Sequence, residues 1–213
     1  MAKTALEDLT ERYGFCDPAS SKTKIKGTRA RSAIILLAVD DLSRIFVLFA
    51  WADRIATNKL RDKIIEVVDQ FKPRRFGIEA NAMQSLFADL VRDAASALKG
   101  QRLPLTEVTQ STKVDKDFRI RTSLQPIIAD GRLFLQPDQY ELKEELKGFP
   151  MTFKKDLVDA LASAITLIPK RRKKQLQKRS TDALAEYLRD SGAPPWYIEK
   201  RIREEAGLEA LQE

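Results

Sequence analysis

The stretch AIILLAVDDLSRIFVLFAW, residues 33–51, decides the fold of this chain. Two apolar runs, at 33–39 and 45–51, flank a short polar break. Runs of this length that are rich in branched and aromatic residues are typical of strands, and a break of this size favours an antiparallel hairpin. Asp40 and Asp41 lie in the expected turn, so we interpret them as structural residues.

Shorter patterns on both sides of the hairpin predict a mixed α/β domain. Proline or glycine ends three of the expected helices, at Pro73, Gly131 and Pro169, and Pro126 is expected to kink or shorten another. Besides the hairpin, we expect strands at 13–17, 75–79, 103–108 and 132–135, and helices at 60–71, 84–98, 116–130, 140–147 and 156–168. The helix at 84–98 is expected to turn five apolar side chains inward: Leu86, Phe87, Leu90, Val91 and Leu98.

The last part of the chain differs in composition from the rest. Residues 170–179 contain seven Lys or Arg, and helical patterns follow at 181–189 and 196–205. We therefore expect one main domain over residues 1–169 and a basic, partly helical extension over residues 170–213.

Composition limits the available chemistry. Cys16 is the single cysteine, which excludes an internal disulfide, and the absence of histidine excludes the usual zinc sites and an imidazole base. Acid-base chemistry must come from carboxylates, lysines, tyrosines or metal-bound water. No apolar run approaches the roughly 20 residues of a membrane span, and no secretory signal opens the chain, so we expect a cytoplasmic protein without a membrane partner.

Four acidic residues lie where expected elements end or begin. Asp17 and Glu79 each end a strand. Asp156 and Asp159 open the last helix of the main domain. Carboxylates placed this way can converge, and like charges a few Å apart repel and raise one another's pKa unless a cation joins them. Because Mg²⁺ and Mn²⁺ prefer oxygen ligands, the pattern predicts a metal site.

Each acid alone has a simpler explanation. Asp156 and Asp159 could cap the helix, since Asp is common in a first turn. Asp17 could be a turn residue before Pro18, and Glu79 could be a solvated strand end. Their joint occurrence, in this order and on these element ends, favours the metal site.

Short motifs connect these acids to a known family. The motifs are Asp17-Pro18-Ala19 and residues 76–81, 113–120, 131–134, 146–150 and 155–161. Over roughly residues 13–168 they resemble the nuclease domain of phage large terminase subunits, a branch of the RNase H-like, resolvase-type superfamily. That family usually has paired aspartates in the last motif. Here Lys155 replaces the first of the pair, which leaves Asp156 as the third expected ligand.

The resemblance implies a mixed five-stranded sheet, three antiparallel strands and then parallel ones, flanked by helices. It implies an endonuclease of low sequence specificity that cuts concatemeric double-stranded phage DNA during genome packaging, in the cytoplasm of a bacterial host. The chain has no Gly-x-x-x-x-Gly-Lys-[Ser/Thr] loop, so it is not the ATPase motor. That motor, the portal and the small terminase subunit are the expected partners.

Hydrolysis of a phosphodiester by such a site is expected to use two Mg²⁺ or Mn²⁺ ions. Asp17 would bridge both ions and Glu79 would bind one of them. Asp156 would bind the other ion, and Asp159, one helical turn away, would bind directly or through water.

Basic residues near the acids are expected to hold DNA phosphates without sequence preference. The chain has 38 Lys and Arg against 31 Asp and Glu, a formal net charge of +7, which favours a polyanionic partner. A loop after Asp17 could overhang the site, facing a second rim. The loop residues are Lys22, Lys24, Lys26, Arg29 and Arg31, and the rim residues are Lys113, Lys116 and Arg119.

Two other functions stay open at this point. A resolvase-type or transposase-type nuclease on the same fold would share the carboxylates but prefer branched or end-specific DNA. A catalytically inert DNA-binding module would use the acids for structure alone. Metal-dependent cleavage that disappears in Asp17→Asn would exclude the inert module.

Overall fold

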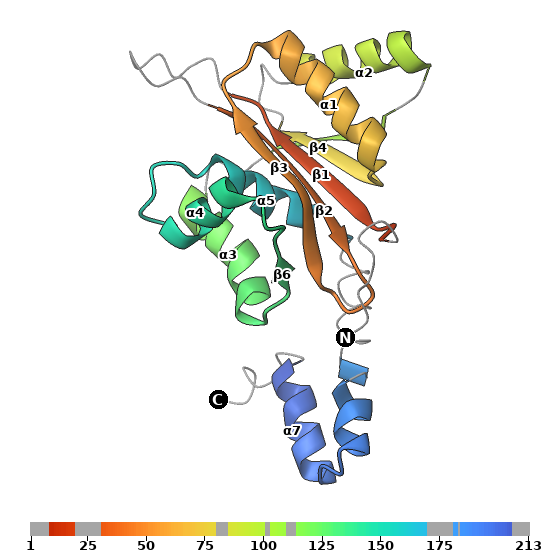
Figure 1. Ribbon diagram of the computed structural model, residues 1–213, viewed down its shortest axis with the longest axis vertical. Helices are drawn as coiled ribbons and strands as arrows, with labels where there is room; N and C mark the ends of the chain where they lie inside the picture. The colour runs from red at the N-terminus through yellow and green to blue at the C-terminus, as the bar shows by residue number, and fades with distance from the viewer. Residues whose placement is uncertain are drawn as a thin grey trace. The chain divides into compact units, whose positions relative to one another are not determined.

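The structure is a computed structural model that describes residues 9–19, 31–79, 85–100, 103–109, 114–169, 181–182 and 184–205. The chain divides into two compact units (Figure 1). The first unit comprises Met1–Val39 and Ile45–Leu167, and the second comprises Asp40–Arg44 and Ile168–Glu213.

Six strands of the described residues form one mixed sheet: β1 (Arg12–Asp17), β2 (Ser32–Val39), β3 (Ile45–Asp53), β4 (Arg75–Glu79), β5 (Leu105–Val108) and β6 (Leu133–Phe134). Their order across the sheet is β5-β4-β1-β2-β3-β6. β1, β2 and β3 pair antiparallel, which confirms the predicted hairpin. β4 runs parallel to β1, β5 parallel to β4, and β6 parallel to β3.

The order and directions of β1 to β5 are those of the RNase H-like fold, so the expected fold class is confirmed. The expected number of five strands was wrong, because β6 adds to the outer edge of β3. Phe134 stacks on Phe46 with ring centroids 5.0 Å apart, and the backbone N–H of Ile45 donates to the carbonyl of Arg132 at 2.7 Å. The strand itself was predicted at 132–135, but its pairing with β3 depends on contacts between residues far apart in the sequence, which no local pattern contains.

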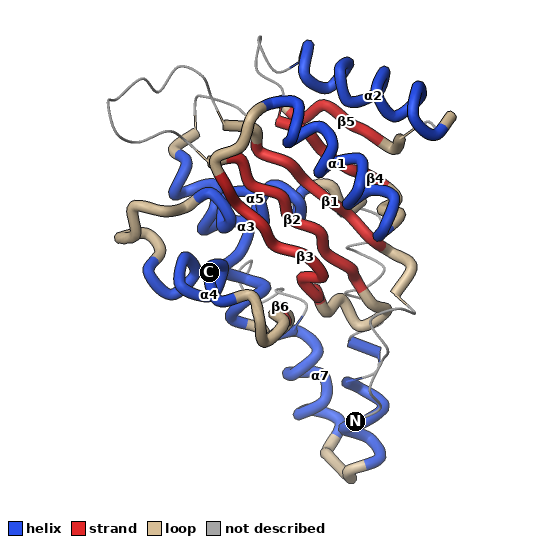
Figure 2. Tube along the Cα trace, turned by 45° about the horizontal axis from the view of Figure 1, so that its top comes forward, coloured by secondary structure: helices blue, strands red, loops and turns tan. Residues whose placement is uncertain are grey.

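Helices cover both faces of the sheet (Figures 1 and 2). They are α1 (Thr57–Phe71), α2 (Ser85–Lys99), α3 (Lys116–Ala129), α4 (Tyr140–Gly148) and α5 (Asp156–Thr166). The second unit contains α7 (Pro195–Glu205). α1 and α2 lie on one face and α3, α4 and α5 on the other. All of β2 and all of α5 from Leu157 to Ile165 are therefore buried. No helix in the described part of the chain is both long and apolar enough to span a membrane.

Two helices depart from expectation. Pro126 was expected to kink or shorten α3. The helix continues through Pro126 to Ala129, so it is not shortened; Leu124 and Ile127, on either side of the proline, are buried and hold the last turn in place. On α2, Phe87 and Val91 are buried as expected, but Leu86 and Leu90 are 73% and 41% exposed. Two alanines take their place in the core, Ala88 and Ala95, because small side chains let the helix pack closely. The side chain of Leu98 lies outside the described residues.

The turn between β2 and β3 is built around Asp40. Its Oδ1 accepts hydrogen bonds from the backbone N–H groups of Leu42 and Arg44, at 2.9 and 2.8 Å. Its Oδ2 accepts from Nε of Arg44 at 2.6 Å. These bonds agree with the structural role inferred for Asp40 from the sequence.

Two glutamines bind the outer edge of β3 next to β6. The side-chain amide of Gln136 donates to the carbonyl of Leu48 at 2.8 Å, and that of Gln139 donates to the carbonyl of Val47 at 3.0 Å. Carbonyl groups that an edge strand would otherwise expose are thus occupied by side chains.

β1 and β4 interlock through paired glycine and phenylalanine residues. Gly14 lies opposite Phe76, and Phe15 lies opposite Gly77. A Cβ added at Gly14 would lie 2.4 Å from Cδ2 of Phe76 and 2.8 Å from Cδ1 of Leu36, and one added at Gly77 would lie 2.7 Å from Cδ2 of Phe15. Each ring therefore fills the space that the glycine opposite leaves open.

We expect Gly14→Ala to destabilise the protein by roughly 1–3 kcal/mol, the usual cost of overpacking a core. The added methyl group would overlap the ring of Phe76, which is completely buried and has no free space to enter. Urea denaturation of the two proteins would measure the difference. Gly131→Ala is the comparison for a glycine whose Cβ would meet open space but whose φ is +64°. Equal stability of Gly14→Ala and the native protein would contradict the prediction.

Candidate active site

Asp17 and Glu79 meet at the carboxyl ends of two adjacent parallel strands. The register pairs Cys16 of β1 with Ile78 of β4, so the next residue of each strand lies at the same edge of the sheet. The side chains of Asp17 and Glu79 are hydrogen-bonded to each other. The interlocked glycine and phenylalanine residues earlier in the same two strands fix the register, and hence the distance between these two carboxyl groups.

A hydrogen bond between two carboxyl groups requires that they share a proton. Burial raises the pKa of Asp17 well above its ordinary value, and the negative charges of Glu79 and Asp159 raise it further, against the opposing effect of Lys116. Burial also raises the pKa of the neighbouring Cys16 thiol, with added contributions from Asp17 and Glu79.

We expect the metal-free protein to lose stability as the pH rises through the raised pKa of Asp17. The pKa is higher in the folded protein than the ordinary value of 3.8, so folding takes up a proton. The stabilising contribution is complete below about pH 4 and is lost at higher pH. Asp17→Asn should remove this loss and make the protein more stable at pH 8 by about 1 kcal/mol, or about 2–4 °C in Tm.

Thermal melts in EDTA from pH 4 to pH 8 test this expectation. The gap between native protein and Asp17→Asn should open as the pH rises. Parallel stability profiles for the two proteins would show that Asp17 has an ordinary pKa.

Asp159 lies on α5 and is paired with two cations of α3. Its side chain is buried, its Oδ1 accepts from Arg119 at 2.5 Å, and its Oδ2 pairs with Nζ of Lys116 at 2.8 Å. Burial alone would lower the pKa of Lys116, but the charges of Asp159, Asp17 and Asp156 outweigh it and raise the pKa. The ammonium group of Lys116 therefore keeps its positive charge beside these carboxylates.

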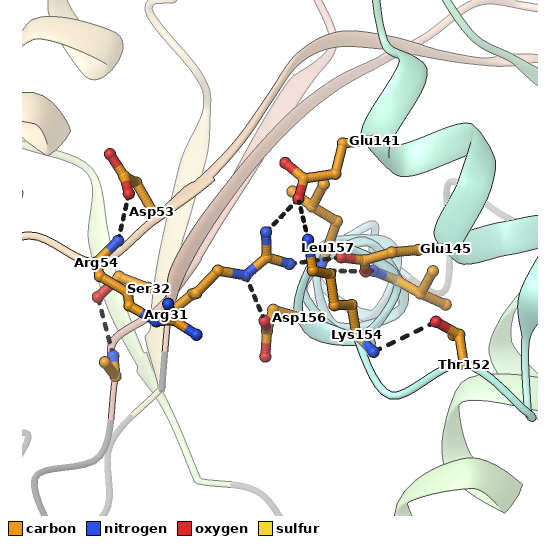
Figure 3. A network of polar contacts seen from close by, with 12 residues as sticks. Arg31, Ser32, Asp53, Arg54, Glu141, Glu145, Thr152, Lys154, Asp156 and Leu157 are labelled. Atoms are coloured by element: carbon orange, nitrogen blue, oxygen red, sulfur yellow. Dashed lines mark hydrogen bonds and ion pairs between the residues drawn. The ribbon is translucent and has the colours of Figure 1, made fainter. Parts of the chain in front are cut away.

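Asp156 is held by Arg31, as Figure 3 shows. Nε of Arg31 donates to Oδ2 of Asp156 at 2.9 Å, one terminal nitrogen donates to Oε1 of Glu145 at 2.7 Å, and the other pairs with Glu141. The Arg31 side chain is only 11% exposed. This guanidinium group joins the start of β2 to α4 and to the N-terminus of α5.

Glu145 is a site residue that the sequence did not reveal. Its buried Oε2 accepts hydrogen bonds from the backbone N–H groups of Leu157 and Val158, at 2.8 and 3.2 Å, and so caps α5 from another helix. Burial raises its pKa, although these N–H groups and Arg31 act in the opposite direction. One sequence feature could have indicated Glu145: it directly precedes residues 146–150, a motif that resembles the terminase pattern.

Lys155, which replaces an aspartate of the terminase pattern, forms an ion pair with α3. Its Nζ pairs with the carboxylate of Asp117 at 2.7 Å and lies 5.7 Å from the centre of the Phe149 ring. The residue therefore fastens the start of α5 to α3.

The four predicted acids thus fall into two groups. Asp17, Glu79 and Asp159 are electrostatically coupled, whereas Asp156 is engaged by Arg31. Among the described residues, no set of three or more Asp, Glu, Cys or His side chains is gathered closely enough to hold a metal ion. The donors nevertheless suit Mg²⁺ or Mn²⁺, because all are carboxylate oxygens and because a proton and Lys116 now supply the positive charge that a cation would bring. Their assignment as ligands stays a prediction.

The predicted DNA-binding residues are placed in part. Arg31 lies in the carboxylate network, and Lys116 and Arg119 lie beside Asp159, so their contacts with DNA stay predictions. The other predicted residues lie outside the described part of the chain: Lys22, Lys24, Lys26, Arg29 and Lys113.

Comparison with known proteins gives similarities of structure alone. No family model and no curated protein matches the chain. A Thermus thermophilus RuvC in complex with a Holliday junction substrate is 14% identical, with a TM-score of 0.41 over 72% of this chain and 91% of that chain. The yeast mitochondrial Holliday junction resolvase Ydc2 is 12% identical, with a TM-score of 0.48 over 80% and 84%. At identities of this size the likeness is one of fold alone.

Proposed function

We propose that this protein is a divalent-metal-dependent endonuclease that hydrolyses phosphodiester bonds of double-stranded DNA. The observation that supports this most strongly is the Asp17–Glu79 pair at the ends of adjacent parallel strands, coupled to Asp159. Three carboxylates in this relation are costly to the fold unless positive charge joins them. Such a costly cluster is typical of a functional site.

The role proposed for each acidic residue follows from its contacts. Mg²⁺ or Mn²⁺, when bound, supplies a nucleophilic water and neutralises charge on the phosphate. Asp17 and Glu79 would hold the metal. The metal ion would replace the proton that the two carboxyl groups share, so positive charge would still lie between them. Asp159 would complete the set from α5, kept in place by Arg119. Asp156 would act as an outer ligand, because its carboxylate also binds Arg31.

The substrate class follows from motif and charge. The resemblance to terminase nuclease domains favours concatemeric phage DNA, with an ATPase motor, portal and small subunit as partners. The formal net charge of +7 supports recognition of the phosphate backbone over recognition of bases. Low sequence specificity is the expected consequence.

DNA binding should depend steeply on salt. Each phosphate that a Lys or Arg neutralises releases counterions, so a protein with six or more such contacts loses roughly 10³-fold in affinity between 50 and 200 mM salt. Fluorescence anisotropy with a short labelled duplex in EDTA measures this slope. Affinity that stays constant over the same range would contradict backbone recognition.

Cleavage of supercoiled plasmid at low salt, with Mg²⁺, Mn²⁺, Ca²⁺ or EDTA, tests the proposed function. We expect nicked and linear products with Mg²⁺ or Mn²⁺ and intact plasmid in EDTA. A synthetic four-way junction is the second substrate, because two of the similar structures are named for Holliday junctions. Strong preference for the junction would indicate a resolvase, and binding without cleavage under any condition would indicate an inert DNA-binding module.

A further inference from the structure

We propose that Lys116 is a positioning residue that neutralises Asp159 in the metal-free protein and passes to a DNA phosphate when the metal binds. This inference rests on the proposed function of the same site. It gives one lysine two successive partners and links metal binding to DNA binding.

The two cations on Asp159 are not equivalent. Arg119 binds Oδ1, and its side chain is 24% exposed. Lys116 binds Oδ2, and its side chain is 50% exposed. Lys116 is also the first residue of α3, where a long flexible side chain can turn away from the helix. Of the two, Lys116 is the cation that can leave while Arg119 keeps Asp159 in place.

The carboxylates around Lys116 explain why a bound metal ion would displace it from Asp159. Its ammonium group is attracted to Asp17 and Asp156 as well as to Asp159, so it lies within the field of the predicted ligands. A divalent ion on Asp17 and Glu79 would neutralise part of that attraction and repel the ammonium group directly. Lys116 therefore competes with the metal for the same carboxylates.

Once released from Asp159, the ammonium group of Lys116 would be free to pair with a DNA phosphate. The half-exposed side chain starts beside the predicted metal ligands, and a phosphate bound at the metal would be the nearest new anion. The carboxylate of Asp159 would then be available to a metal ion, and Lys116 would be available to the phosphate. Because the exchange is reciprocal, bound DNA should in turn favour the metal.

Mn²⁺ affinity without DNA, measured by isothermal titration calorimetry, tests the competition. We expect Lys116→Met to bind Mn²⁺ about 10-fold more tightly than the native protein, while its metal-dependent cleavage falls. Lys116→Arg keeps the positive charge and should retain the native Mn²⁺ affinity. Arg121→Met is the matched control, because Arg121 is an exposed cation on the same helix and lies away from the acids.

The outcomes separate this inference from the proposed function. Native protein that binds Mn²⁺, with Lys116→Met no tighter than Arg121→Met, would overturn the role of Lys116 and leave the nuclease proposal standing. Absence of Mn²⁺ binding in all four proteins would overturn both. Thermal melts of each variant confirm that it is folded before titration.

Discussion

Asp17→Asn should reduce metal-dependent DNA cleavage by roughly 10³-fold or more, while DNA binding in EDTA is retained. Asp17 is hydrogen-bonded to Glu79 and is also affected by the charge of Asp159. An amide keeps the shape of the side chain but cannot supply a charged oxygen to a metal ion. Initial rates of plasmid nicking with Mg²⁺ and Mn²⁺ measure the effect.

Asp138→Asn is the matched control for this experiment, because it makes the same chemical change at an exposed residue. It should cleave at the native rate. The variant at Asp17 should also be the more stable protein at pH 8, so loss of cleavage cannot be attributed to unfolding. Cleavage that persists in Asp17→Asn would show that the metal site is assigned to the wrong residues.

Glu145→Ala should destabilise the fold by roughly 3–5 kcal/mol, the usual cost of breaking a buried ion pair. The change removes the most buried of the three carboxylates that bind Arg31, and with it both hydrogen bonds that Glu145 accepts at the start of α5. For a chain of this size we expect Tm to fall by about 6–20 °C. Differential scanning calorimetry at pH 7 measures the shift.

The adjacent residue provides the control. Glu144 is 73% exposed and pairs with Lys147, which is also exposed, so Glu144→Ala should change stability by less than about 0.5 kcal/mol. Glu145→Gln keeps an acceptor for the N–H groups of Leu157 and Val158 and should fall between the two. A loss in Glu145→Ala no larger than in Glu144→Ala would refute the capping role.

The acids on strands were predictable, and those on helices only in part. Asp17 and Glu79 follow short apolar strands, and parallel pairing of β1 with β4 is enough to bring them together. Glu145 lies in a helix with Glu141 and Glu144, and the local sequence gives no reason to choose among the three. Its importance depends on α4 meeting the N-terminus of α5, a tertiary contact that no local pattern contains.

The ion-pair partners of charged residues could not be predicted from local sequence patterns either. Arg31 was predicted to face DNA because it ends a basic loop, yet it binds Asp156 and Glu145, which lie more than a hundred residues away in the sequence. On α2, Phe87 and Val91 were predicted correctly, but Leu86 and Leu90 are exposed, because close packing selected Ala88 and Ala95 for the core. Periodicity identifies an element, whereas the partner of each face depends on how the elements pack.

The glutamines at the edge of β3 bear on the solubility of the protein. An open edge strand can recruit a strand from a second molecule and start aggregation. Here the carbonyl groups of Val47 and Leu48 already accept hydrogen bonds from Gln139 and Gln136, and β6 covers the residues before them. A second copy would have to displace both amides before it could extend the sheet there, so this edge is protected without a charged side chain.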